Sequence, residues 1–405
     1  MKKKNIKYHN NIPGKYFNKQ KQKKNNLIVS KILQDIFENI SKKKNTYHLL
    51  SKSLKLNFEQ KDLIRYKNYK QIIVVGMGGS ILGIKAIYSF LEKKINKKFI
   101  FIDNLNENQI ANYLKFQVSK KNLFIIISKS GNTIETLTNI NLIKINKLTR
   151  SNTIIITEEK ANALNKFAKK FKLLVIEHKS FIGGRYSILS EVGMVPACIM
   201  GLNIKKLRDN LLVHFNIKKN QYLINSISTM SQIYLSKKIS SIVFFNYSSE
   251  LDNFVYWCQQ LIAESLGKKN KGLMPIFSSA PKDHHSLLQL YLDGPKDKIF
   301  YIISSNTKKE PEMEKNIFSD SLNYLNNKKI SKIKSAQKNA FIKVLKRKKL
   351  PFREIEINKV SEETMGELFS YFIMEIALTA KLIGVNAFDQ PAVEEVKNLT
   401  KKFLS

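Results

Sequence analysis

Short apolar runs alternate with helical patterns along the first half of the chain, and this alternation constrains the fold more than any other feature. Each run is followed by a segment with apolar residues at helical spacing, as in residues 80–94 after the first run. Continuous apolar strands joined by helices indicate a parallel sheet covered on both faces. The predicted strands are QIIVVGMGG (71–79), KKFIFID (97–103), NLFIIIS (122–128), SNTIIIT (151–157) and FKLLVIE (171–177).

The same alternation starts again after a mainly helical stretch, residues 186–239. A long helix is predicted over 361–384, with Gly384 as its C-terminal cap. A last helix follows, in which Pro391 is tolerated in the first turn. We therefore predict an α/β fold of two tandem domains, each a mainly parallel sheet flanked by helices. The strands predicted for the second domain are 240–248, 297–304 and 351–357.

Four segments follow from these patterns: a basic tail (1–25), an N-terminal domain with leading helices (26–200), a C-terminal domain (201–384) and a C-terminal helix (385–405). Ten lysines precede Asp35, the first acidic residue. A block of like charges repels itself, so we expect the tail to be solvated. A helical pattern over residues 27–55 follows it.

The formal net charge of +38 raises the question of nucleic-acid binding. Only six of the 70 basic residues are arginine, and the 64 lysines are scattered among asparagine and isoleucine. Arginine is the usual reader of base edges. Lysine, asparagine and isoleucine all have AT-rich codons, so genome composition is the simpler explanation of the charge. We expect no specific nucleic-acid partner; DNA binding abolished by physiological salt would mark the charge as incidental.

The cysteine content and hydropathy point to a cytoplasmic protein without a membrane partner. Cys198 and Cys258 both lie in apolar runs and supply neither a disulfide framework nor a cysteine-rich zinc site. No apolar stretch reaches the roughly 18 residues that span a bilayer. The first 20 residues lack the apolar core of a secretory signal.

Two strand-to-helix junctions in the first half have the chemistry of a phosphate site. GMGGS (76–80) allows the backbone to turn tightly and places Ser80 at a helix start. SKSGNTIET (128–136) follows an apolar strand and combines hydroxyl groups with Lys129. Hydroxyls, free N–H groups and a helix dipole at strand ends suit a phosphate monoester. Ordinary helix capping is the structural alternative.

A dinucleotide site is a competing interpretation of the first junction. The fingerprint G-x-G-x-x-G requires glycine at position 81, which is Ile81, and Asp103 is only a loose candidate for its acidic residue. A Walker motif, G-x-x-x-x-G-K-[ST], does not occur in the sequence. The sequence therefore favours a phosphate monoester over a nucleotide cofactor.

Six motifs occur in the order found in glucose-6-phosphate isomerases, and the chain resembles that family from about residue 70 to its end. The resemblance implies two sugar-isomerase (SIS) domains, no cofactor, a sugar 6-phosphate substrate and a homodimer with a shared site. It also implies a place in glycolysis and gluconeogenesis. The motifs are GMGGSILG (76–83), SKSGNTIET (128–136), GGRYSILSEVGMVPA (183–197), ESLGK (264–268), HHSLLQLYLDGP (284–295) and FDQPAVEEVK (388–397).

The resemblance assigns the phosphate group of the substrate to hydroxyls and amides of the first two motifs. The residues implied are Ser80, Ser128, Lys129, Ser130 and Thr133, with backbone help from Gly79. These are the same loops that the residue chemistry indicates.

The resemblance also assigns the proton transfers of an aldose–ketose isomerisation. Glu264 is implied as the base that moves a proton between C2 and C1 through a cis-enediolate. Arg185 is implied as the cation that stabilises the enediolate, and His285 and Lys397 as the groups that open the sugar ring. His285 often comes from the partner subunit in this family. From the residues alone, two structural alternatives remain open. Glu264 could be a solvated glutamate at a helix end, and Arg185 could belong to a structural ion pair.

Two motifs depart from the family pattern and put loop geometry in doubt. Leu266 stands where the family commonly has asparagine, and APKDHHS replaces G-T-N-G-Q-H-S. A zinc site on Asp283, His284 and His285 is rejected, because consecutive residues do not readily converge on one ion.

Two other functions remain open. One is a related isomerase that also acts on mannose 6-phosphate. The other is a non-catalytic protein of the same domain type that binds sugar phosphates; such regulators usually carry a helix-turn-helix segment, and residues 1–25 are too polar for one.

Overall fold

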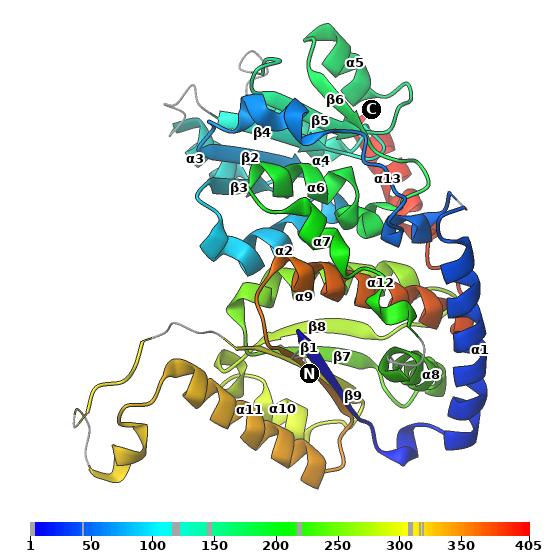
Figure 1. The fold of residues 1–405 in the computed structure, drawn as a ribbon, viewed down its shortest axis with the longest axis vertical. Helices are drawn as coiled ribbons and strands as arrows, with labels where there is room; N and C mark the ends of the chain where they lie inside the picture. Colours follow the sequence, from blue (N-terminus) through cyan, green and yellow to red (C-terminus); the bar gives the residue numbers. More distant parts are fainter. Residues whose placement is uncertain are drawn as a thin grey trace.

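The computed structural model describes residues 5–42, 44–115, 122–143, 148–216, 221–306, 311–315, 317 and 320–405, and its two sheets lie one above the other (Figure 1). The first sheet is fully parallel, in the order β3-β2-β4-β5-β6. All five strands predicted for the first half are confirmed. They are β2 (Gln71–Gly76), β3 (Lys98–Ile102), β4 (Asn122–Ile127), β5 (Thr153–Thr157) and β6 (Leu174–Glu177).

Side chains of the first sheet alternate between two hydrophobic clusters, one on each face. In β2, Ile72 and Val74 join one cluster, and Ile73 and Val75 join the other. This double burial explains why the strands are continuously apolar. The helices of this domain are α2 (Leu82–Leu91), α3 (Glu107–Lys115), α4 (Ile134–Leu142), α5 (Ala163–Lys170) and α6 (Glu191–Ile199).

The second sheet has the order β1-β10-β9-β7-β8, with all neighbours parallel except the antiparallel pair β1 and β10. The three predicted strands of the second half are confirmed, and two further strands form the edges. The strands are β1 (Ile6–Asn11), β7 (Ser241–Asn246), β8 (Met274–Ser279), β9 (Lys298–Ser305) and β10 (Phe352–Ile357). The predicted α/β fold with two mainly parallel, helix-flanked sheets is confirmed.

The expectation of a solvated tail over residues 1–25 is wrong for its described part. β1 pairs with β10, and Ile6 is buried opposite Ile357. α1 (Lys19–Asn39) begins at Asn18, whose side chain accepts a hydrogen bond from the Lys21 amide. Most of the charged side chains stay in solvent, so the lysines do not prevent packing.

The N-terminal segment belongs with the second domain, not with the first as its position suggests. α1 packs along α8 (Gln221–Ser236), where Gln22 Nε2 donates to Thr229 Oγ1 at 2.7 Å. Figure 1 shows α1 running beside the second sheet. The second domain is therefore discontinuous in sequence.

α12 (Glu362–Ile383) is the long helix predicted from the sequence, and it lies between the two sheets (Figure 1). Ser361 caps its start, and Gly384 ends it in the left-handed conformation with φ of 74°. It packs against α7 (Ile204–Asp209), α8 and α9 (Asp252–Leu266). The other helices are α10 (Leu288–Asp293), α11 (Ile330–Arg347) and α13 (Pro391–Leu404), the last with Pro391 in its first turn as predicted.

None of the helices in the described residues is both long enough and apolar enough to cross a membrane.

Candidate active site

The two loops predicted to hold a phosphate lie side by side at the carboxyl edge of the first sheet. β2 and β4 are neighbours, and Gly76 pairs with Ile127 at the ends of both strands. The strand order reverses at this pair, because the connection from β2 leads to β3 on one side and the chain returns to β4 on the other. Such a switch point is where open α/β sheets bind ligands.

Hydroxyl groups gather in the loop after β4. Ser128 Oγ lies 2.8 Å from Thr133 Oγ1, and Ser130 Oγ lies 3.5 Å from the same atom. The loop turns at Gly131, which has φ of 68°, and its amide donates to Ser128 Oγ. Thr133 caps α4 without a side-chain hydrogen bond to the helix. Three predicted phosphate residues are thus brought together at a helix N-terminus, whose positive end favours an anion.

Lys129 points to other groups in this structure. Its Nζ donates to the carbonyl oxygen of Ser180 at 3.0 Å and lies 3.4 Å from Glu158 Oε1. Partial burial would raise the pKa of Glu158, but hydrogen bonds and charges from Lys160 and Lys129 outweigh it and lower that pKa. Lys129 therefore contributes positive potential near the loop and makes no contact with its hydroxyls.

Glycines in the loop after β2 bring it against the residues predicted for proton transfer. A Cβ atom on Gly79 would lie 2.5 Å from the Arg185 amide nitrogen, closer than side chains tolerate. Gly78 has φ of 51°, and a Cβ there would lie 2.7 Å from Gln260 Nε2. Only glycine allows this close approach, which joins the first domain to α9. Ser80 ends the short turn that precedes α2.

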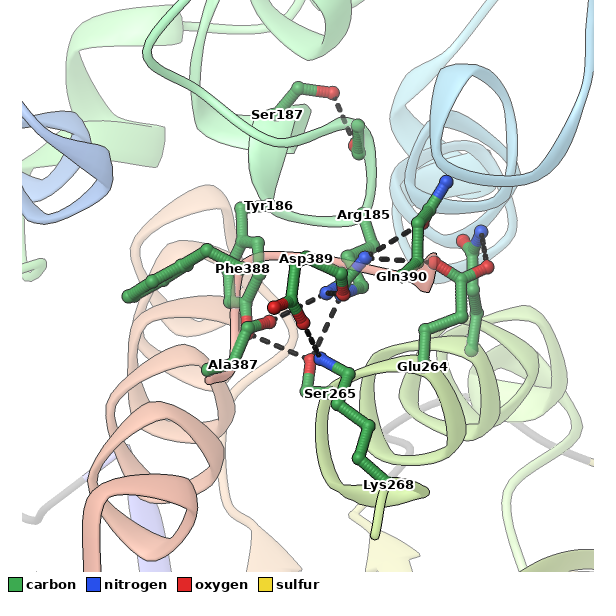
Figure 2. A network of polar contacts seen from close by, with 12 residues as sticks. Arg185, Tyr186, Ser187, Glu264, Ser265, Lys268, Ala387, Phe388, Asp389 and Gln390 are labelled. Atoms are coloured by element: carbon green, nitrogen blue, oxygen red, sulfur yellow. Dashed lines mark hydrogen bonds and ion pairs between the residues drawn. The ribbon is translucent and has the colours of Figure 1, made fainter. Parts of the chain in front are cut away.

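The Arg185 guanidinium lies at the centre of a network that joins three distant parts of the chain (Figure 2). The side chain is buried, and it donates through all five of its N–H groups. The acceptors are Ser265 Oγ (2.9 Å), Glu264 Oε2 (3.0 Å), Gln390 Oε1 (2.9 Å), the Ala387 carbonyl (2.6 Å) and the Asp389 carbonyl (2.9 Å).

Glu264 lies in the last turn of α9 with its carboxylate held from both sides. Oε2 pairs with Arg185 and Oε1 accepts from Gln260 Nε2 at 2.9 Å. About a quarter of the side chain, 27%, is exposed to solvent. The carboxylate is therefore oriented by two donors and still reachable by a small molecule.

The segment before α13 closes one side of this network. Asp389 pairs with Lys268 at 2.8 Å, and Tyr186 donates to the Ala387 carbonyl at 3.1 Å. Gln390, which precedes Pro391, contacts the guanidinium directly. Neither Gln390 nor Ser265 was predicted from the sequence, although both lie inside motifs quoted above. The available signal was the position of Gln390 directly before Pro391.

His285 and Lys397 are not brought to Arg185 or Glu264 within the described residues. His285 is exposed after the short turn Lys282–His284. Lys397 lies on the exposed helix α13 and pairs with Glu394 at 2.7 Å. The neighbouring His284 bonds Tyr247 through Nε2 at 2.7 Å, and burial lowers its pKa.

The two departures from the family pattern have local structural roles. Leu266 is fully buried at the end of α9, where it packs in the core. Asp283 accepts from Ser278 Oγ and the Ser279 amide, both at 2.8 Å. Partial burial would raise the pKa of Asp283, but these bonds and one from Ser286 outweigh it and lower that pKa. Asp283 therefore fixes the loop that carries both histidines.

Comparison with known proteins supports one family over most of the chain. Residues 63–405 match the model of the family described as phosphoglucose isomerase. The chain is 35% identical to a glucose-6-phosphate isomerase of Methanocaldococcus jannaschii over 84% of this chain and 86% of that protein. It is 32% identical to the one of Campylobacter jejuni, over 89% of this chain and 91% of that protein.

A solved structure of a glucose-6-phosphate isomerase from Chlamydia trachomatis has a TM-score of 0.70 at 18% identity. The likeness covers 95% of this chain and 74% of the other. The expected SIS-type fold is thereby confirmed.

Proposed function

The chain belongs to the phosphoglucose isomerase family, and from this premise we propose that it interconverts glucose 6-phosphate and fructose 6-phosphate without a cofactor. The observation that carries the proposal is the Arg185–Glu264 pair lying against the loop after β2, next to the hydroxyl cluster after β4. The reaction needs a site for the phosphate group and a carboxylate base that both reach the same small substrate.

In this mechanism the substrate phosphate binds at Ser128, Ser130 and Thr133, with Ser80 and the Gly79 amide on the adjoining loop and Lys129 supplying positive potential. The open-chain aldose then presents C2 to Glu264. The carboxylate takes the C2 proton, and the electron pair of the broken C–H bond moves through C1 onto the carbonyl oxygen O1, which forms the cis-enediolate. Glu264 returns its proton to C1, and the proton of the C2 hydroxyl passes to O1, which leaves the ketose carbonyl at C2.

Arg185 has a positioning role in this proposal in addition to its charge. Its five donors are already used, so it acts on the enediolate through its positive field beside Glu264 and not through a new hydrogen bond. A fixed cation stabilises developing negative charge more than it stabilises the neutral substrate.

His285 and Lys397 are assigned to ring opening. Because His285 is exposed and separate from Glu264, the proposal includes a homodimer in which this histidine reaches the site of the other subunit. Lys397 lies seven residues after Gln390 on the same C-terminal segment, and a rotation of α13 about Gln390 would change its distance from the site.

The activity is tested with a coupled assay. Fructose 6-phosphate is supplied, and NADPH made by added glucose-6-phosphate dehydrogenase is followed, with mannose 6-phosphate in a parallel reaction. Rapid NADPH formation from fructose 6-phosphate alone is expected. Comparable formation from mannose 6-phosphate would indicate the broader isomerase, and absence of signal from folded protein would contradict the proposal and favour a sugar-phosphate sensor.

The base is tested by Glu264→Gln, which keeps the shape and removes the proton acceptor. We expect kcat to fall by about 10² to 10⁴-fold, the usual contribution of a positioned base, with the Michaelis constant little changed. Glu38→Gln, on an exposed part of α1, is the matched control. Retained turnover, or equal loss in both kinetic constants, would refute the assignment.

A further inference from the structure

The second sheet repeats the strand order of the first and so has a switch point of its own. β8-β7-β9-β10 corresponds position by position to β3-β2-β4-β5. The reversal falls between β7 and β9, and their carboxyl ends form the edge where a ligand crevice is expected. In the proposed isomerisation the loop after β8 supplies His285, whereas the ends of β7 and β9 have no assigned role.

A cavity of about 510 Å³ lies at that edge. It is bounded by Tyr247 after β7, by Ser304 and Ser305 at the end of β9, and by the start of α11. Figure 1 shows α11 lying against one face of the second sheet. The volume falls within the range of about 300 to 1,000 Å³ that small-molecule sites occupy, and it exceeds the space of a single phosphate ion.

The charge of the cavity wall is strongly positive. Five lysines line it and no carboxylate does, among the described residues; they are Lys328, Lys329, Lys332, Lys334 and Lys338. Lys334 donates to the Tyr247 carbonyl at 3.0 Å. Over the same described ranges, Lys328, Lys329 and Lys332 form no ion pair.

One lysine is built into the wall. Lys338 is 8% exposed, and its Nζ donates to Ser304 Oγ at 3.2 Å and to Glu354 Oε1 at 2.6 Å. A second carboxylate beside the wall, Glu250, accepts a hydrogen bond from Ser305. Both acidic groups are therefore engaged, and the lysines that remain unpaired face the cavity.

The start of α11 adds to this positive potential. α11 has 18 residues and contains no acidic residue in its first turn. Its N-cap residue, Lys329, has no side-chain acceptor, so no negative side chain compensates the positive end of the helix. A helix N-terminus and lysines together form the usual surroundings of a bound phosphate.

From the cavity, its lysines and the helix start, we infer a second anion site on the second domain, which binds a small compound with two or more phosphate groups. The ligand class is a condensed phosphate or a bisphosphate, because several separated lysines and the cavity volume exceed what one phosphate needs. This site is separate from the loops after β2 and β4.

The probe is inorganic pyrophosphate, titrated by calorimetry into the full-length protein at low and at physiological salt. The titrations use a Ser130→Ala, Thr133→Val background, so that the first-domain loops contribute no heat. Binding is expected there, and Lys328→Ala with Lys332→Ala is expected to weaken it by about tenfold or more. The control double variant, Lys343→Ala with Lys346→Ala, changes the same net charge further along α11 and is expected to weaken it less than twofold.

Equal weakening in both double variants would overturn the proposal, because it would mark diffuse attraction to a basic surface. Absence of pyrophosphate binding to the background protein would also overturn it. All four lysines are exposed, so circular dichroism of each variant should match that of the parent protein.

Discussion

Arg185 holds together segments that lie 80 and 205 positions away in the sequence, at Ser265 and Gln390. Lysine carries the same charge but has three donors on one nitrogen and lacks the planar fork. Arg185→Lys is therefore expected to leave buried acceptors unpaired and to lower the free energy of unfolding by about 2 to 4 kcal/mol. Isomerase turnover should fall at least a hundredfold as Glu264 loses its orientation.

Urea unfolding and steady-state kinetics check this prediction, with the exposed Arg150→Lys as the control. A variant with parental stability would mean that the network adapts around a smaller cation. Parental turnover would mean that Glu264 does not depend on Arg185.

His178 is a buried group whose charge state couples stability to pH. Burial, and then the positive charge of Lys129, lower its pKa from 6.5 to about 4. The folded protein keeps the ring neutral, whereas the unfolded chain binds a proton below about pH 6.5. The stability contributed by this group is therefore complete above pH 6.5 and is lost as pH falls towards 4, by about 3 kcal/mol in all.

Urea unfolding at pH 7, 6 and 5 measures this loss. His178→Gln should flatten the fall in stability over that range, while His9→Gln, on the exposed side of β1, should leave it unchanged. An unaltered slope in the His178 variant would show that other groups cause the pH dependence.

At the scale of elements, the edges of the second sheet are where sequence reasoning failed. The central strands of both sheets are mostly apolar runs buried on two faces, which made them easy to predict; β10, with the sequence FREIEI, is the exception. β1 reads IKYHNN, with polar residues in most positions, and β8 contains Pro275, which interrupts a strand pattern. Both are edge strands, and their sequences match an edge rather than a core.

The candidate site was also predicted only in part from the sequence. The hydroxyl loop and the residues of the Arg185–Glu264 pair were predicted, because short motifs carry them. The carbonyl groups of Ala387 and Asp389 were not, since backbone atoms leave no mark on residue identity. The approach of Gly79 to Arg185 depends on how two domains pack, which local patterns do not encode.

β1 offers a test at this scale. Ile6 is 2% exposed opposite β10, so Ile6→Asp would bury an unpaired charge. We expect the free energy of unfolding to fall by about 2 to 4 kcal/mol. Lys7→Ala, on the exposed face of the same strand, should change it by less than about 0.5 kcal/mol. Urea denaturation compares the two, and equal small effects would mean that β1 does not stabilise the second sheet.

At the scale of the whole molecule, the functional groups gather where three segments meet. The first domain supplies Arg185 and the phosphate loops, the second supplies Glu264, and the C-terminal segment supplies Gln390. Figure 2 shows all three converging on the guanidinium. The relative position of the domains is therefore part of the site, and α12 between the sheets fixes that position.

The pairing of β1 with β10 also affects how the chain is made. Asn10 and Arg353, which bond at 3.0 Å, are 343 positions apart. At about 5 to 20 residues per second, β1 leaves the ribosome roughly 20 to 70 seconds before its partner exists. The first sheet can form during this interval, while β1 remains unpaired. The histidine and asparagines of β1 make the unpaired strand polar, which protects the nascent chain from aggregation until the second sheet is completed.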